Sequence, residues 1–355
     1  MKTAVTADLH LQAGDEYPER YQALRTLLTC VYKEGIRHLI IAGDLFHKDI
    51  RNLSDFESVC REEPFRSIRI TVVPGNHDCV LDNRRLASDN VTVVDQPVLI
   101  QEDLMGMPLL FVPYDSKKTM GEVIASFMEE LKDGRWILIG HGDWIQGLGQ
   151  VNPLEPGVYM PLTRRDLEQF QPAAAILGHI HKPTDSECVH YPGSPHPLDI
   201  NETGPRRLLV LDTETAAVTS LSLPSSVVYF QESFIVFPEE QETEWLSREI
   251  KRRIHEWGVD SNTLKRVKVR VRVSGYTSDK KKLLETIFGQ FRGIEFFDKE
   301  PDLTRVFQED PDPDRREIIR RVMEKINTLE WPEENEPFRD EILLQAMHVI
   351  YGEPS

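Results

Sequence analysis

The first half of the chain contains five short apolar runs, each of which stands directly in front of a polar residue. The runs AVTA, HLIIAG, RITVVPG, WILIG and AAAILG end immediately before Asp8, Asp44, Asn76, His141 and His179. Short apolar runs bounded by glycine or polar residues are typical of buried strands. Helical patterns occur at 18–34, 54–63, 120–132 and 163–169. Strands and helices that alternate in this way predict an α/β fold.

From about residue 225 the pattern changes to strand, helix, strand. The run RVKVRVRVSG alternates valines with Lys268, Arg270 and Arg272, so we expect one buried face and one face that carries a row of cations. This row is either a surface that contacts phosphates or an ordinary solvated strand face, and the residues alone favour neither. A helix at 279–290 and a strand near 293–298 are expected to complete a small α+β unit.

The C-terminal region combines an acidic stretch with two amphipathic helices. Residues 298–341 are acidic and interrupted by prolines, notably in EDPDPD at 309–314, which predicts a linker or an extended arm. The helical apolar positions are Ile318, Ile319, Val322, Ile326 and Leu329, and then Phe338, Ile342, Leu343, Met347 and Ile350. Such faces must be buried, either on a partner or on the protein's own body. The expected domains are therefore 1–222, 223–298 and 299–355.

Seven side chains with metal-binding chemistry follow the predicted strands. They are Asp8 and His10 in ADLH, Asp44 in GDLFH, Asn76 in GNHD, His141 in GHGD, and His179 and His181 in GHIH. If the strands lie side by side, these groups converge at one edge of a sheet. Two carboxylates, one carboxamide and four imidazoles suit Mn, Fe or Zn better than Ca or Mg. The set contains no thiolate, which argues against a closed structural zinc site.

A cluster of this kind predicts two metal ions that share one carboxylate. Two divalent ions about 3.5–4 Å apart repel each other unless an anion lies between them, and we assign Asp44 to that position. The expected ligands of one ion are Asp8, His10 and His181, and those of the other are Asn76, His141 and His179. Two carboxylates leave a net positive charge, which would attract a phosphodiester and lower the pKa of a bridging water. The expected nucleophile is therefore a hydroxide that bridges the metals.

His77 follows Asn76 directly and is the candidate proton donor. The alkoxide that leaves in phosphodiester cleavage needs a proton, and the pKa of histidine suits this task near neutral pH. Asp78 is expected to orient the His77 ring. Each motif alone is a weak signal, but their occurrence in this order on successive strand ends is not expected by accident.

The five motifs together resemble the calcineurin-like metallophosphoesterase superfamily, whose signature the chain matches through residues 8 to 181. This resemblance implies a four-layer α/β/β/α sandwich built on two mixed sheets, with two metal ions at the sheet ends. The metal assignment given above agrees with the pattern of that superfamily.

Within the superfamily the chain is similar to the SbcD-type nuclease subunits of DNA break repair, the bacterial relatives of the meiotic recombination eleven nucleases. His47 in GDLFH stands where those nucleases carry a histidine that helps to position the DNA end. YPGSPHP at 191–197 resembles a block near their active site and makes Gly193 and Ser194 candidate DNA contacts. Gln12 replaces the usual glycine after DLHL, and the chain is short for that family.

The SbcD-type resemblance also implies an activity and partners. It implies an exonuclease on DNA ends and an endonuclease on single strands, and we expect Mn²⁺ to be the activating metal. It further implies a homodimer, a cap domain that favours a DNA-contacting role for the cation row, and C-terminal helices that dock on an SbcC-like coiled-coil ATPase. The chain carries no Walker A sequence, so any ATP dependence would come from another polypeptide.

Composition limits these expectations only in part. The 355 residues carry a formal net charge of −17, which is unusual for a DNA-binding protein and would have to be offset by metal ions and a local basic face. The four cysteines are widely spaced, as expected of reduced thiols in a cytoplasmic protein, and Cys79 is expected to be buried. The chain starts with a strand that leads to Asp8, so a cleaved signal peptide is not expected, and because no apolar run reaches membrane-spanning length, a membrane span is not expected either.

Two other functions are compatible with the motifs. A small-molecule phosphodiesterase that acts on cyclic nucleotides or nucleotide sugars would carry the same five motifs, although the extra C-terminal domains argue against a minimal enzyme. A non-enzymatic scaffold with this fold would be expected to have lost ligands, whereas all seven are present here.

Overall fold

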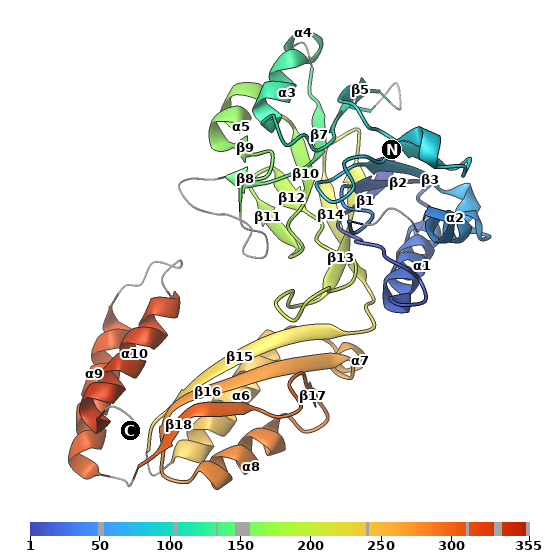
Figure 1. The fold of residues 1–355 in the computed structure, drawn as a ribbon. Coiled ribbons are helices and arrows are strands. Elements are labelled where there is room, and N and C mark those ends of the chain that lie inside the picture. The colour runs from blue at the N-terminus through green and yellow to red at the C-terminus, as the bar shows by residue number, and fades with distance from the viewer. Residues whose placement is uncertain are drawn as a thin grey trace. The chain divides into compact units, whose positions relative to one another are not determined.

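The structure is a computed structural model that describes residues 1–48, 53–101, 106–132, 134–145, 157–238, 241–309, 312–329 and 336–352. It divides into two compact units, Met1–Ser226 and Val227–Ser355 (Figure 1). Within the described ranges, every helix is too short or too polar to cross a bilayer.

The first unit is built on two mixed sheets. The first sheet has the order β14-β13-β1-β2-β3-β4, formed by Val218–Leu223, Arg206–Asp212, Lys2–Thr6, His38–Ala42, Arg69–Val73 and Val91–Val93. The second has the order β11-β12-β10-β7-β6-β5, formed by Thr184–Ser186, Val189–Tyr191, Ala174–Gly178, Ile137–His141, Leu109–Val112 and Val98–Ile100. The strands β1 to β4 run parallel to one another, as do β6, β7, β10 and β12, while the flanking strands β13, β5 and β11 are antiparallel to β1, β6 and β12. The carboxyl ends of the parallel strands therefore share one edge of each sheet.

Side chains on the strands alternate between two apolar layers. In β2, Leu39 and Ile41 pack toward the helices α1 (Pro18–Lys33) and α2 (Leu53–Arg61), while Ile40 lies in the layer between the sheets. The outer face of the second sheet is covered by α3 (Met120–Ser126), α4 (Met128–Leu131) and α5 (Arg164–Phe170). A small pair, β8 (Trp144–Ile145) and β9 (Leu162–Thr163), lies beside α5. This arrangement confirms the four-layer α/β/β/α sandwich (Figure 1).

The second unit alternates strands and helices along the chain. Its elements are β15 (Val228–Val236), α6 (Glu242–Glu256), α7 (Ser261–Leu264), β16 (Val267–Thr277), α8 (Lys280–Gln290), β17 (Glu295–Phe296), β18 (Asp302–Gln308), α9 (Pro313–Thr328) and α10 (Glu336–Tyr351). The described strand pairings are all parallel, so strands and helices alternate here where the sequence predicted an α+β unit. The valines of β16 pack with Leu246, Ile250, Leu283 and Ile287 of α6 and α8, as their spacing predicted.

The predicted linker is partly wrong. Residues 302–308 form β18, which pairs with β16, and α9 begins at Pro313 after an N-cap in which Asp312 accepts a hydrogen bond from the amide of Asp314. The helices α9 and α10 lie side by side (Figure 1) and contribute Ile319, Met347 and Tyr351 to a cluster with Tyr276 of β16. At least one face of this helix pair is therefore buried on the protein's own second unit.

Glu232 on β15 is a buried carboxylate whose ionisation should affect stability. Trp257 Nε1 donates a 2.6 Å hydrogen bond to Glu232 Oε1, and Arg253 Nη1 lies 3.5 Å from Oε2. Burial raises the pKa of Glu232, and the contacts with Trp257 and Arg253 only partly offset this. A raised pKa in the folded state means that the folding penalty of this group is absent below its unfolded pKa and is complete above its folded pKa.

Glu232→Gln is therefore expected to stabilise the second unit at pH 8, with a gain that shrinks as the pH falls toward 4.5. The amide still accepts the Trp257 hydrogen bond, and the half-exposed Arg253 pair that is lost contributes little. Urea unfolding at several pH values measures the effect. Glu285→Gln, at an exposed carboxylate of α8, is the control and should give no such pH-dependent gain. A Glu232→Gln variant that is less stable than wild type at pH 8 would contradict the expectation.

Candidate metal centre

The seven predicted ligands lie at the carboxyl ends of the central strands of the first unit. Asp8 and His10 follow β1, Asp44 follows β2, Asn76 follows β3, His141 ends β7, and His179 and His181 follow β10. The two sheets are joined at this edge, because the amide of His179 donates a 2.9 Å hydrogen bond to Asp8 Oδ1. Parallel strands thus bring together groups that are up to 173 positions apart in sequence, from Asp8 to His181.

The backbone at four of these ligands is strained. Asp8, His10, Asp44 and His179 have φ values of 56°, 46°, 50° and 99°, in a region that residues other than glycine rarely adopt. Each such backbone conformation destabilises the fold by about 1–3 kcal/mol, so contacts with the surrounding structure must hold the residue in place. The loops after β1 and β2 do this for each other, because the amides of Asp8 and His10 donate to the carbonyls of Gly43 and Asp44. Strain of this kind is typical of functional sites.

One group of ligands surrounds a point next to His10. His10 Nε2 lies 3.0 Å from His181 Nε2 and 3.5 Å from Asp44 Oδ2. Asp8 Oδ2 is fully buried and has no hydrogen-bond partner among the residues that the structure describes. A buried carboxylate oxygen without a partner is costly, and a cation would satisfy it. These donors therefore fit the predicted ion with Asp8, His10 and His181 as ligands.

The other group is centred on His141. His141 Nε2 lies 2.7 Å from Asn76 Oδ1 and 3.5 Å from Asp44 Oδ2, and the ring of His179 is 5.5 Å from that of His141. Asp44 Oδ2 is therefore equally close to a ligand of each group. The structure brings all seven residues together and gives Asp44 the position expected of the shared carboxylate.

The charges of the cluster suit cations. Burial and the neighbouring imidazoles lower the pKa of His10 well below its usual value, so its ring is neutral and can donate a lone pair. Burial raises the pKa of Asp8 to about 8, against the opposing effect of His181. A divalent ion beside Asp8 would favour its ionised form.

Two ligand imidazoles use their second ring nitrogen for a hydrogen bond, and a third lies beside a carboxylate. His141 Nδ1 lies 3.1 Å from the carbonyl of Ala42, His181 Nδ1 lies 2.8 Å from Glu202 Oε1, and His179 Nε2 lies 3.4 Å from Asp143 Oδ1. Such contacts fix the tautomer and the orientation of a metal-binding histidine. Asp143 and Glu202 were not among the residues predicted from the sequence. Asp143 ends the GHGD motif and could have been noticed, whereas Glu202 carries no local signal.

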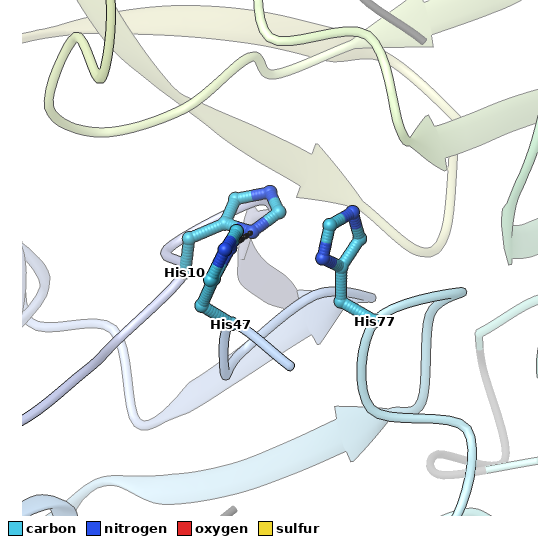
Figure 2. A group of neighbouring side chains, drawn as sticks. All are labelled: His10, His47 and His77. Carbon is cyan, nitrogen blue, oxygen red and sulfur yellow. Dashed lines mark hydrogen bonds between the residues drawn. The ribbon is translucent and has the colours of Figure 1, made fainter. Parts of the chain in front are cut away.

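His77 and His47 lie beside His10 at the rim of the cluster. The ring of His77 is 4.7 Å from that of His10 and 5.1 Å from that of His47, and the three rings come from three loops (Figure 2). His77 Nε2 lies 4.0 Å from Asp44 Oδ2, and its amide donates a 2.9 Å hydrogen bond to Asp44 Oδ1. His47 Nδ1 lies 3.4 Å from His10 Nδ1. Both rings are therefore placed next to the predicted metal ions.

Asp78 has a different role from the predicted one. Its carboxylate is buried and accepts hydrogen bonds from the amides of Gly75, at 2.7 Å, and Phe46, at 3.1 Å. Asp78 thereby ties the loop after β3 to the loop after β2, which carry Asn76 and Asp44. The prediction that Asp78 orients the His77 ring is therefore wrong, because its carboxylate positions the backbone of the two loops instead.

Most of the residues predicted to contact DNA are either buried or paired with acidic residues. Ser194 is fully buried and donates a 2.7 Å hydrogen bond to Glu202, so its side chain does not lie on a surface, and Gly193 has a φ of 75° in the adjoining turn. In the second unit, Lys268 pairs with Glu295 at 2.7 Å. Arg270 pairs with Asp298 at 2.7 Å and Arg272 is exposed. The cation row is thus largely neutralised by acidic neighbours.

A cleft of about 630 Å³ borders the cluster at Asn76. Its lining includes Tyr114 and Tyr159, whose rings are 6.2 Å apart, and Lys48 and Lys118. Cys79 also lines it and is exposed, contrary to the predicted buried position. The cleft offers aromatic faces and ammonium groups to a substrate that is bound at the metal centre.

Gly178→Ala is expected to damage the centre without removing a ligand. A Cβ at this position would overlap the carbonyl of Ala42 and approach His141 Nδ1 to 2.7 Å, which would break the hydrogen bond between them. We expect a loss of about 1–3 kcal/mol in unfolding free energy, as for other overpacked sites, together with weaker metal binding. Thermal unfolding and metal analysis measure both. Gly134→Ala, where a Cβ would meet no described atom within 4 Å, is the control; equal behaviour of the two variants would contradict the assignment.

Comparisons with known proteins were made for sequence and for fold. A family model described as calcineurin-like phosphoesterase matches residues 1–183. No curated protein sequence matches the chain.

Solved structures that match part of this chain include TT1561 of Thermus thermophilus, with 14% identity and a TM-score of 0.39, covering 63% of this chain and 99% of that one. A dimetal phosphatase from Danio rerio has 10% identity and a TM-score of 0.41, with coverage of 63% and 99%. Yfce, a phosphoesterase from E. coli, has 14% identity and a TM-score of 0.31, with coverage of 63% and 100%. The family model spans more than half of the 355 residues, and the seven ligand types lie together. The chain therefore belongs to the calcineurin-like phosphoesterase family of dinuclear, metal-dependent hydrolases.

Proposed function

We propose that this protein is a DNA nuclease of the SbcD type, which hydrolyses phosphodiester bonds with two divalent ions, Mn²⁺ being the activating metal. The observation that carries the proposal is the pair of imidazoles of His77 and His47, 5.1 Å apart and next to His10 and Asp44. A phosphodiester needs a proton for its leaving alkoxide, and two histidines at the metal centre supply the groups for positioning the phosphate and delivering that proton.

In this proposal the metal ions, Asp44 and the two histidines have separate roles in the reaction. When bound, the two ions supply Lewis-acid activation of a water molecule and of the scissile phosphate. Asp44 holds the two ligand groups together through its central position. His77 donates the proton to the leaving oxygen, and His47 orients the strand end beside it. The buried cluster fixes these groups in advance, so little reorganisation is needed during the reaction.

The cleft beside Asn76 favours a nucleotide-containing substrate. Tyr114 and Tyr159 offer ring faces on which bases can stack, and Lys48 and Lys118 offer positive charge to flanking phosphates. Asp95 and Asp115 also line the cleft, and Lys118 pairs with Asp115 at 3.8 Å, so the positive charge of the lysines is partly offset there. Exonuclease action on DNA ends and endonuclease action on single strands belong to the proposal through the resemblance to SbcD-type nucleases.

The second unit supports a partner role. While Ile319, Met347 and Tyr351 of α9 and α10 pack internally, Ile318 and Ile342 are exposed, and Val349 is 86% exposed. We propose that these positions dock on an SbcC-like coiled-coil ATPase in a DNA repair complex that contains a homodimer of this chain. Pull-down with such an ATPase should succeed for wild type and fail for Val349→Asp. Equal capture of the two would contradict the proposed docking face.

A small-molecule phosphodiesterase remains the alternative, because a metal centre and a nucleotide-sized cleft would serve it equally. Purified protein with Mn²⁺ should cleave linear duplex and single-stranded DNA and leave cyclic nucleotides and nucleotide sugars intact. The Asp44→Asn variant is the control for contaminating nucleases. Turnover of the small substrates without cleavage of DNA would replace the nuclease by the alternative.

A further inference from the structure

Behind His181, on the side away from His10, lies a buried carboxylate that belongs to none of the sequence motifs. Glu202 is 2% exposed, and its Oε1 lies 2.8 Å from His181 Nδ1. Its other oxygen, Oε2, accepts hydrogen bonds from Ser194 Oγ at 2.7 Å and from the amide of Leu198 at 3.1 Å. Glu202 follows the segment covered by the family model, which ends at residue 183.

The contact with Glu202 determines which nitrogen of His181 can bind a metal. An ionised carboxylate accepts hydrogen bonds and donates none, so Nδ1 must carry the proton. Nε2 is then the ring nitrogen left to bind a metal ion, and it lies 3.0 Å from His10 Nε2, on the side of Asp8 and Asp44. The negative charge also makes Nε2 a stronger donor to a cation.

A buried arginine keeps this carboxylate in place. Arg206 is fully buried, and its Nη1 lies 3.8 Å from Glu202 Oε2. Its guanidinium also donates to the backbone carbonyls of Glu202, Thr203 and His181, at 2.9, 2.7 and 3.0 Å. The same cation therefore offsets the buried charge and holds both chain segments, those of His181 and Glu202, at a fixed spacing.

We propose that Glu202 is a positioning residue of the metal centre, which fixes His181 in the Nδ1–H tautomer and thereby sets the affinity of the ion bound by Asp8, His10 and His181. Ser194 and Arg206 hold Glu202 in the required orientation. The inference rests on the metal centre of the proposed function but not on the identity of the substrate.

The test is Mn²⁺ binding to the metal-free protein, measured by titration calorimetry on wild type and on Glu202→Gln. Glutamine keeps the size of the side chain, but its single carbonyl oxygen cannot accept hydrogen bonds from His181 and from Ser194 and Leu198 together. We expect one of the two Mn²⁺ sites to weaken by about 10- to 100-fold, as for other such partners of metal-binding histidines, while the second site changes far less. Turnover should recover at saturating Mn²⁺.

Glu214→Gln is the matched control, because Glu214 is exposed and its carboxylate pairs with the N-terminal ammonium at 3.0 Å instead of with a ligand histidine. Unchanged binding at both sites of a folded Glu202→Gln variant, or equal weakening of both sites, would overturn the inference. If circular dichroism shows that Glu202→Gln does not fold, Mn²⁺ binding to Ser194→Ala tests the proposal instead. This variant should weaken Mn²⁺ binding at the same site several-fold, and an unchanged affinity would overturn the proposal. Absence of Mn²⁺ binding in wild type would instead refute the metal centre itself.

Discussion

Replacing Asp44 with asparagine is expected to empty both metal positions and to abolish phosphodiester hydrolysis. Asp44 Oδ2 lies 3.5 Å from His10 Nε2 and 3.5 Å from His141 Nε2, so one negative charge serves both ligand groups. A neutral amide cannot offset the repulsion between two divalent ions about 3.5–4 Å apart. The loss of turnover should exceed the roughly 10²–10³-fold effect of removing one charge-stabilising group. Metal analysis after dialysis and hydrolysis of bis(p-nitrophenyl) phosphate measure the two effects.

The asparagine variant keeps the local backbone, because its carbonyl oxygen can still accept the hydrogen bond from the amide of His77. Unfolding is therefore not the expected cause of the loss, and circular dichroism checks this. Asp89→Asn, at an exposed carboxylate of the same unit, is the matched control. An Asp44→Asn protein that still holds two Mn²⁺ ions after dialysis would show that this carboxylate is not shared between them.

The ligand cluster was predictable because its geometry follows from a local rule. Each ligand stands just after an apolar run, and the carboxyl ends of parallel strands lie at a common edge. The register of the strands then places the ligand loops side by side. Gly178 pairs with His141, so the loop that carries His179 starts beside the end of β7. The four-layer arrangement came from resemblance to a known superfamily, since apolar runs alone do not specify how two sheets pack.

The groups behind the ligands could not be predicted in the same way. Glu202 reaches His181 because the chain returns after 21 residues, and Asp78 bonds to backbone amides of a loop 32 residues earlier. Neither contact produces a periodic pattern. Ser194 was predicted to contact DNA because YPGSPHP resembles a block near the active site of SbcD-type nucleases, yet such a resemblance does not tell whether the serine side chain is covered by other segments.

Charge patterns were the least reliable guide in the second unit. Acidic residues and prolines led to a predicted linker, although DLTRVFQ at 302–308 places Leu303 and Val306 in the apolar core. Pairing with β16 outweighed the local composition. The predicted row of unpaired cations was wrong for a similar reason. Glu295 and Asp298, from a later segment, form ion pairs with Lys268 and Arg270.

Replacing His77 with serine is expected to lower kcat by about 10²–10⁴-fold, the usual contribution of a general acid, while metal content stays near that of wild type. The His77 side chain is only 7% exposed and its Nε2 lies 4.0 Å from Asp44 Oδ2, so the ring stands beside the metal centre. Its contact with Asp44 through the backbone amide survives the substitution. Single-turnover cleavage of DNA and metal analysis test both parts.

The choice of leaving group distinguishes proton donation from other roles of His77. A DNA alkoxide needs a proton to leave, whereas p-nitrophenolate is stable without one, so a general acid matters much less for the latter. His77→Ser should therefore lose far more activity on DNA than on bis(p-nitrophenyl) phosphate. Equal losses on the two substrates would assign His77 to phosphate binding, and loss of a metal ion would make it a ligand. Because the His47 ring is only 5.1 Å away, the His47→Ser variant must be measured beside it, and its effect should not depend on the leaving group.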